Sequence, residues 1–168
     1  MSLEPIPAPV FASFWQRRVV APLLAQLRQG ITPQKIALTV ALGIVLGIFP
    51  VFGATTVLCA VAALWLRLNQ PVIQLVNYAM SPVHFLLMLP FWRAGESLFG
   101  QEHLPLLAVG ELIARFEAAP GQFVLDYSRA IASGIGVWAL VAPVLAGLIY
   151  LIARPLLRAL VQQTEAAP

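Results

Sequence analysis

Charged residues are scarce in this chain. Only 10% of its 168 residues are Asp, Glu, Lys or Arg, whereas 60% are apolar. Soluble domains carry about 25% charged residues, so this composition could not cover a surface that faces water. Charge is also absent in blocks, because residues 36–66, 68–92 and 130–153 contain none. A soluble core would not separate charge so completely, and we therefore predict a protein embedded in a lipid bilayer.

Several catalytic and metal-binding patterns are missing as well. Cys59 is the only cysteine, which excludes an internal disulfide and C-x-x-C chemistry. His84 and His103 are not spaced with cysteines or acids as a metal-ligand set. Catalytic serine motifs and glycine-rich phosphate loops do not occur. The long apolar segments contain no Asp or Glu that could form a proton relay. We expect neither an enzyme nor a bound metal or cofactor.

The basic residues do not point to nucleic acid. Ten Lys and Arg residues give a net charge of +3, and Arg17-Arg18 is the only adjacent pair among them. A basic rim on the cytoplasmic side of a membrane explains this balance. We therefore expect the lipid bilayer, and no nucleic acid, as a partner.

The first uncharged segment, 36–66, is interrupted by Pro50 and Gly53. A membrane span needs about 20 apolar residues to cross a hydrocarbon core of about 30 Å. The two arms, 36–49 and 54–66, reach only about 20 Å each at about 1.5 Å per residue. Two half-length helices that enter the membrane and return to the same side fit these lengths. The sequence thus predicts a re-entrant helical hairpin.

Capping residues mark the starts of the two hairpin helices. Thr32 suits the N-cap of the first helix, and Pro33 suits its first helical position. Thr55 and Thr56 open the second helix, and we expect one of them to cap it.

A pair of glycines, Gly43 and Gly47, forms a G-x-x-x-G pattern in the first hairpin helix. Such glycines let another backbone come close in an apolar setting. The pattern predicts packing within this chain in the first place, and a homo-oligomer through the same face as the alternative.

The remaining segments complete an all-α fold. Residues 1–30 are interpreted as a Pro-rich tail and an amphipathic helix, which lies either in the headgroup plane or on the bundle. Segment 68–92 is expected to span the membrane with a kink, 93–129 to form an acidic amphipathic region, and 130–153 to span again. Residues 156–168 are expected to be a cytoplasmic tail. The prediction is a small polytopic helical membrane protein with a re-entrant or broken hairpin and amphipathic interfacial helices.

Positive charge indicates an orientation, because Lys and Arg near span ends accumulate on the cytoplasmic side. The relevant residues are Arg17, Arg18, Arg28, Lys35, Arg67, Arg154 and Arg158. We predict a multi-pass inner-membrane protein with a membrane-embedded domain at 31–155 and both termini in the cytoplasm. In the alternative arrangement, Ser81-Pro82 forms a second re-entrant tip opposed to the first. Cysteine accessibility at positions 67, 103 and 158 would distinguish the two.

Polar residues gather around the expected breaks and form a candidate pathway. They are Thr55, Thr56, Arg67, Asn69, Asn77, Ser81 and His84. Discontinuous helices form the substrate sites of many transporters, so these groups are candidates for lining a cavity. Alternatively, they only satisfy the backbone groups freed at broken helix ends. Arg67 could also extend its side chain to the membrane interface.

One stretch of sequence has a familiar pattern. It reads TPQKIALTVALGIVLGIFPVFGATTVLCAVAALWLRLNQPV and is followed by NYAMSPVHFLLMLPFW. It resembles the bacterial membrane family catalogued as domain of unknown function 2062. The matching motif positions are Pro33, Gly43, Gly47, Pro50, Gly53, Thr56, Arg67, Asn69 and Pro82. Thr55 and Ser81 replace residues that are often Gln and Asn in that family. The resemblance implies a shared fold with the break as a common motif, and it implies no activity.

Two functions remain open from the sequence. The first is a small transporter or lipid-translocating protein built on the hairpin. The alternative is a non-catalytic membrane scaffold or assembly partner. An intramembrane enzyme is disfavoured because no nucleophile is paired with a base.

Overall fold

The computed structural model describes residues 32–105 and 108–165, and side chains up to residue 159. Helices make up most of this part of the chain, and it contains no strand, which confirms the all-α prediction. The expected tail and amphipathic helix of residues 1–30 lie outside the described residues. The helices are α3 Pro33–Gly47, α4 Ala54–Trp65, α5 Gln70–Ala79, α6 Ser81–Leu98, α7 Val109–Ala118 and α8 Pro120–Glu165.

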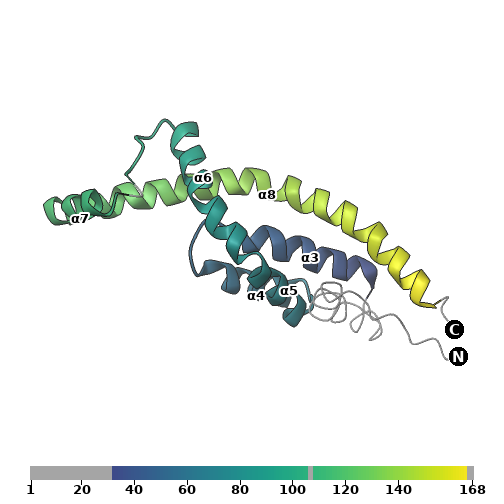
Figure 1. The fold of residues 1–168 in the computed structure, drawn as a ribbon. Coiled ribbons are helices and arrows are strands. Elements are labelled where there is room, and N and C mark those ends of the chain that lie inside the picture. The colour runs from purple at the N-terminus through teal and green to yellow at the C-terminus, as the bar shows by residue number, and fades with distance from the viewer. Residues whose placement is uncertain (1–31, 106–107, 166–168) are drawn as a thin grey trace, which may run out of the picture.

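Helix α3 is the centre of the bundle and contacts α4, α5 and α8 (Figure 1). It begins as the sequence predicts, because the Thr32 side chain accepts a hydrogen bond from the Lys35 N–H and Pro33 follows at the first position. Its apolar residues point in all directions, which is typical of a helix surrounded by others. Cys59 of α4 lies in the core beside it, as expected for a small packing residue.

The chain breaks between α3 and α4, as the sequence predicts from Pro50 and Gly53. The two arms have 15 and 12 residues, so each is shorter than a membrane span. Gly53 is the N-cap of α4 and has a φ of 79°, a left-handed conformation that favours glycine. The expected threonine cap is wrong: α4 starts at Ala54, so Thr55 and Thr56 lie inside its first turn, and none of the described side chains caps it.

The next segment is broken too. Helices α5 and α6 meet at Met80 with a bend of 63°, so the expected kinked span 68–92 consists of two helices. By length and composition, this bent pair of helices fits either one broken membrane span or a re-entrant loop. Pro82 occupies the first turn of α6, where a proline is tolerated.

The directions of the helices follow from their contacts. Gly43 lies against Ile73 and Val76, and Gly47 against Asn77 and Met80, so α3 and α5 run parallel. Gln70 contacts Ala60 and Gln74 contacts Thr56, so α4 runs antiparallel to α5. Leu157 packs on Ile36 and Ala37, whereas Trp138 reaches Val45, so α8 runs antiparallel to α3.

The glycine pair of α3 packs within the chain. A Cβ on Gly43 would lie 2.9 Å from the Val76 Cβ, and one on Gly47 would lie 3.1 Å from the Met80 Cβ. Both glycines are buried. This is the first of the two interpretations of the pattern. A homo-oligomer through the same face stays a prediction, and it would require α5 to give way.

Helix α6 crosses α8 at a second close contact, visible where the two ribbons meet in Figure 1. A Cβ on Gly95 would lie 2.5 Å from the Ser133 backbone, and one on Gly134 would lie 2.6 Å from the Trp92 ring. Only glycine permits this approach at either position. The crossing fixes the end of α6 against the middle of the bundle.

Helix α8 is longer than the span 130–153 expected from the sequence. Its 46 residues continue through Pro143 and Pro155, so residues 120–129 and most of the expected tail 156–168 are helical. The amphipathic helix within the expected acidic region is α7, and it lies beside the first turns of α8, away from α3 (Figure 1).

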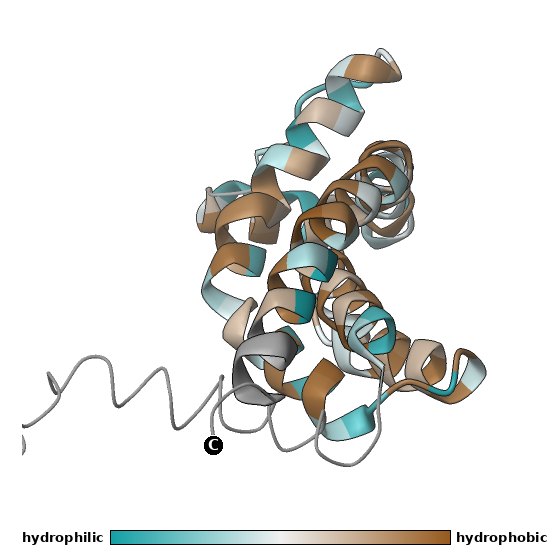
Figure 2. Ribbon diagram, turned by 90° about the vertical axis from the view of Figure 1, so that its right-hand side faces the viewer, coloured by the Kyte–Doolittle hydropathy of each residue, from teal (hydrophilic) through white to brown (hydrophobic). Residues whose placement is uncertain are grey.

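Apolar residues occur along all the helices of the bundle (Figure 2), and many large apolar side chains are exposed on its outside. Helix α8 is long and apolar enough to cross a membrane, and α5 with α6 would make a second span if the bent pair is counted as one. Only 6% of the most apolar stretch of α8 is buried by the rest of the described chain. By length and composition, one helix therefore qualifies as a span, and α3 and α4 are shorter apolar helices.

Candidate functional site

The carbonyl groups freed at the α3–α4 break are bound by two tryptophans. The Phe49 N–H bonds to the Leu46 carbonyl instead of the Val45 carbonyl, which leaves the latter without its helical partner. The Trp138 indole donates to Val45 O at 3.0 Å, and the Trp92 indole donates to Pro50 O at 2.9 Å. Since a buried carbonyl without a donor is costly in an apolar setting, the indoles stabilise the break.

A line of amide side chains joins α5 to α4. Gln70 donates to the Ala60 carbonyl at 2.9 Å, and Gln74 donates to the Thr56 carbonyl at 3.0 Å. Asn77 donates to the Thr56 hydroxyl at 3.4 Å and to the Gln74 amide oxygen at 3.3 Å. These bonds hold α4 alongside α5.

A hollow of about 150 Å³ opens where this line reaches the break. We call it the break hollow. Its lining comes from the end of α3, the start of α4, the end of α5 and the start of α6: Gly47, Phe52, Gly53, Thr55, Thr56, Asn77, Tyr78, Ser81, His84 and Phe85. None of these residues carries a permanent charge. The hollow therefore offers hydroxyl, amide and imidazole groups beside three aromatic rings.

His84 is the most deeply placed polar group of the break hollow after Asn77. Only 5% of its surface is exposed, and its Nδ1 atom has no hydrogen-bond partner among the described residues. The ring contacts the Phe85 ring edge-on, with centroids 5.5 Å apart. A buried imidazole nitrogen without a partner is unusual, because most buried polar atoms are paired.

The structure brings together five of the seven candidate pathway residues. Thr55, Thr56, Asn77, Ser81 and His84 all line the break hollow. Arg67 and Asn69 do not, because they lie beyond the opposite end of α4. Arg67 is exposed, and the Asn69 side chain caps α5 by accepting from the Val72 N–H at 3.0 Å.

The break motif residues have different roles. Gly47 and Gly53 line the hollow, Gly43 packs on α5, and Pro50 is buried and presents its carbonyl to Trp92. Pro82 is exposed in the first turn of α6 and is not part of the lining.

Sequence reasoning missed Gln70, Gln74 and the two indoles. A signal for the amides was present, because Gln70, Gln74, Asn77, Ser81 and His84 recur at spacings of four and three. That spacing marks one face of a helix. For the tryptophans, the signal was an indole N–H inside an uncharged segment, which needs an acceptor when buried.

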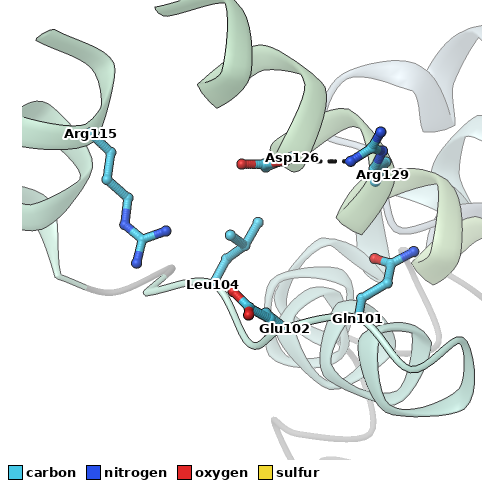
Figure 3. A pocket seen from close by; sticks show the side chains of 6 residues that line it. All are labelled: Gln101, Glu102, Leu104, Arg115, Asp126 and Arg129. Carbon is cyan, nitrogen blue, oxygen red and sulfur yellow. Dashed lines mark ion pairs between the residues drawn. The ribbon is translucent and has the colours of Figure 1, made fainter. Parts of the chain in front are cut away.

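A second, larger hollow of about 260 Å³ lies beside α7 (Figure 3). Arg115 faces it from α7, Asp126 and Arg129 from α8, and Glu102 from the loop after α6. Asp126 and Arg129 are 3.7 Å apart, and the side chains of Arg115 and Arg129 are 47% and 65% exposed. Two acids balance two bases there, so we do not take this hollow as the principal site.

The buried Glu96 carboxylate holds the loop that lines this second hollow. Glu96 is fully buried, accepts from the Arg93 guanidinium at 2.8 Å and accepts from the Leu104 N–H at 3.3 Å. These bonds fix the loop after α6. Burial raises the pKa of Tyr127, which lines an adjoining hollow of about 190 Å³, and the Arg115 charge opposes that shift.

Comparisons with known proteins identify a family and no function. A family model described as an uncharacterized protein conserved in bacteria (DUF2062) matches residues 16–166. No curated protein matches the chain significantly, and no solved structure does. Among the described residues, no group of three or more His, Cys, Asp or Glu side chains could hold a metal ion.

Proposed function

The chain belongs to this uncharacterized bacterial family, DUF2062, and on that premise we propose that it is a multi-pass protein of the inner membrane that moves a polar group past a re-entrant helical hairpin. The moved group is either a small solute or the headgroup of a lipid. The observation that carries the proposal is the break hollow, where four segments place uncharged polar side chains at the ends of discontinuous helices.

The exposure of α8 supports insertion into the bilayer. Its outward side chains include Leu140, Val144, Leu148, Leu151 and Ile152, all more than half exposed. Fully burying one such side chain contributes about 1.5–3 kcal/mol, so leaving the whole face in water would be costly. The core helix of a soluble protein would be mostly buried, and this helix is not.

The charges at the two ends of the bundle support the orientation. Given the helix directions, one end of the bundle carries four basic residues, Lys35, Arg67, Arg154 and Arg158. Arg93, Arg115 and Arg129 lie toward the other end among Glu96, Glu102, Glu111, Glu117 and Asp126. Clustered Lys and Arg favour the cytoplasmic side, so both termini are cytoplasmic and the α6–α8 connection lies outside.

The parallel course of α3 and α5 supports the in-and-back hairpin. Helix α3 enters from the basic end, α4 returns to it, and α5 enters again before α6 continues beyond the bend. In this arrangement the break lies within the membrane. Unpaired backbone groups are tolerated there only inside protein or beside a polar cavity, and the break hollow is such a cavity.

Reconstituted vesicles test the proposal. The purified protein is placed in phosphatidylcholine vesicles, and two rates are measured: the exposure of a dye-labelled phospholipid to an impermeant quencher, and glycerol-driven vesicle swelling. We expect at least one rate to exceed that of protein-free vesicles. Asn77→Ala should lower it about fivefold or more, because a buried hydrogen bond worth about 1 kcal/mol or more is lost.

Two further variants make the result specific. Gly53→Ala meets none of the described residues within 4 Å, and it tests the break itself because alanine is strained at a φ of 79°. Ser128→Ala removes an exposed hydroxyl that bonds only to its own helix, and it should leave both rates unchanged. If neither rate exceeds the background, or if both persist in Asn77→Ala and Gly53→Ala, the proposal is wrong.

A membrane scaffold is the second candidate, and the outward stripe of α7 favours it. Val109, Ile113 and Phe116 are each more than half exposed at helical spacing. This role needs no enzyme activity and no cofactor, and it is compatible with a homo-oligomer. Background rates in both vesicle assays, together with a self-association constant measured by light scattering in detergent, would favour the scaffold.

A further inference from the structure

The hollow of about 260 Å³ beside α7 receives charges of both signs from three separate segments (Figure 3). Arg115 faces it from α7, Asp126 and Arg129 from α8, and Glu102 from the loop after α6. Each ion pair that the described residues form joins two residues of one helix. None of these pairs crosses the hollow, so the charges on its different walls do not pair with one another.

The charged groups of this hollow keep hydrogen-bonding capacity. The Arg115 guanidinium has several N–H donors, and among the described residues it makes a single hydrogen bond, within α7. Asp126 is contacted by Gln122 and by Arg129 at the same oxygen, Oδ1, so Oδ2 remains an acceptor. The Glu102 side chain is exposed and has no hydrogen-bond or ion-pair partner among the described residues. Exposed ion pairs within one helix contribute little, so a ligand can compete with them.

Buried and aromatic contacts hold the walls of the hollow in place. Glu96 is fully buried and accepts from the Leu104 N–H at 3.3 Å, which fixes the loop that carries Glu102. The Phe123 ring of α8 packs edge-on against Phe116 of α7, with centroids 5.5 Å apart. This contact holds α7 beside α8. A preorganised site loses less conformational freedom when a ligand binds.

An adjoining hollow of about 190 Å³ adds an apolar wall. It shares Arg115 and Asp126 with the first hollow, and its further lining includes Ala118, Ala119 and Phe123. Together the two volumes fall within about 300–1,000 Å³, the range of small-molecule sites. A ligand with a charged end and an apolar end fits this pair of hollows.

The position of the hollow along α8 points to the membrane interface. Arg129 is the last charged residue before the uncharged segment 130–153. With that segment in the bilayer, as proposed above, the hollow lies at the depth of the lipid headgroups on the outer side.

We propose that this hollow binds a zwitterion, with its anionic group at Arg115 and its primary ammonium at Asp126 and Glu102. The two carboxylates would repel a simple anion, and the two guanidinium groups would repel a simple cation, whereas a zwitterion complements both signs. Arginine can also bind two oxygens of one carboxylate or phosphate. The headgroup of phosphatidylethanolamine and a free amino acid share this chemistry. Binding at headgroup depth rests on the proposed insertion of α8, and not on transport at the break hollow.

The chemistry of the ligand is tested on the full chain in nanodiscs of phosphatidylglycerol, a lipid without an ammonium group. One arm compares thermal stability after phosphatidylethanolamine or phosphatidylcholine is added in equal amounts. The other arm titrates L-leucine by calorimetry, with N-acetyl-L-leucine as the control that lacks an ammonium group. We expect phosphatidylethanolamine to stabilise more than phosphatidylcholine, or L-leucine to bind and its acetylated form not to bind. A quaternary ammonium has no N–H to donate to a carboxylate.

Variants that each remove one acidic charge locate the response. Glu102→Gln changes the hollow without removing a contact within the described chain. Asp126→Asn keeps an oxygen acceptor for Gln122. Glu117→Gln is the matched control, because Glu117 is exposed on α7 and lines neither hollow. We expect the first two variants to weaken the response about tenfold, since each loses a charge-assisted hydrogen bond, and the control to change it less than about threefold.

The outcomes separate the sources of the ligand. A response to phosphatidylethanolamine identifies a lipid headgroup, and a response to L-leucine alone identifies a solute. Equal effects of phosphatidylethanolamine and phosphatidylcholine, together with no binding of L-leucine, overturn the zwitterion site. A loss in Glu117→Gln as large as that in Glu102→Gln overturns it too. Since neither arm measures transport, these results and the vesicle rates can fail separately.

Discussion

The two indoles at the break show how single residues make an interrupted helix stable in an apolar setting. Trp138 of α8 donates to a carbonyl in the last turn of α3, and Trp92 of α6 donates to the Pro50 carbonyl between α3 and α4. Phe49 packs edge-on against the Trp138 ring with centroids 4.9 Å apart. Such an arrangement binds the backbone without adding charge, so it suits a membrane interior.

Removing one indole N–H should destabilise the protein measurably. We predict that Trp138→Phe lowers the free energy of unfolding by about 1–3 kcal/mol, because Val45 O is left buried without a donor. The midpoint of thermal unfolding in detergent micelles would measure the loss. Trp65→Phe is the matched control, since Trp65 is 86% exposed, and it should change stability by less than about 0.5 kcal/mol. Equal effects of both substitutions would contradict the role of Trp138.

Two close contacts between helices organise the elements. One joins α3 to α5 through Gly43 and Gly47, and the other joins α6 to α8 through Gly95 and Gly134. The first contact packs α5 against α3 of the hairpin. The second packs α6, the helix after the bend, against α8. Because neither can accommodate a Cβ without movement, both restrict how far the segments around the break hollow can shift.

Substitution at the α6–α8 crossing tests this restriction. A Cβ on Gly95 would lie 2.5 Å from the Ser133 backbone, so we predict that Gly95→Ala destabilises the protein by about 1–3 kcal/mol through overpacking. Gly147→Ala in α8 meets no described residue within 4 Å and should stabilise the helix by roughly 0.5–1 kcal/mol. Thermal unfolding of the two variants in the same detergent should give shifts of opposite sign. A stabilising Gly95→Ala would show that the helices do not cross so closely.

The helices themselves were predictable where the signal is local. Pro50 and Gly53 mark the α3–α4 break, and the first helix begins at its Thr32 cap because both signals depend on neighbouring residues. The threonine cap of α4 was wrong because the left-handed Gly53 occupies the N-cap position. Which residue becomes the N-cap of α4 depends on the conformation of the whole turn between α3 and α4.

The site was predictable only in part, because its members come from distant segments. Thr56 and Asn77 could be suspected as polar residues near breaks, but their contact requires α5 to return along α4. The bond from Trp138 to Val45 joins residues 93 positions apart, and no periodicity reports such a pair. Arg67 and Asn69 were included for their position in the sequence, and the antiparallel course of α4 takes them away from the hollow.

The whole molecule combines an apolar exterior with a difference in charge between its ends. The parallel α3 and α5, with α4 and α8 antiparallel to α3, bring the basic residues flanking several helices to one end. This asymmetry could not be established from α8 alone, since a single apolar helix spans in either direction. It yields a test of orientation that does not depend on any transport activity.

Single cysteines in a Cys59→Ala background measure the orientation. Gln34→Cys and Ala159→Cys mark the basic end while preserving its Lys and Arg residues, and His103→Cys marks the opposite end. We predict that an impermeant maleimide labels His103→Cys in right-side-out membrane vesicles and the other two only in inside-out vesicles. If Gln34→Cys and His103→Cys are labelled from the same side, α5–α6 does not cross the membrane. The alternative with a second re-entrant tip at Ser81-Pro82 would then replace the single hairpin, because an odd number of crossings is needed to separate position 103 from position 34.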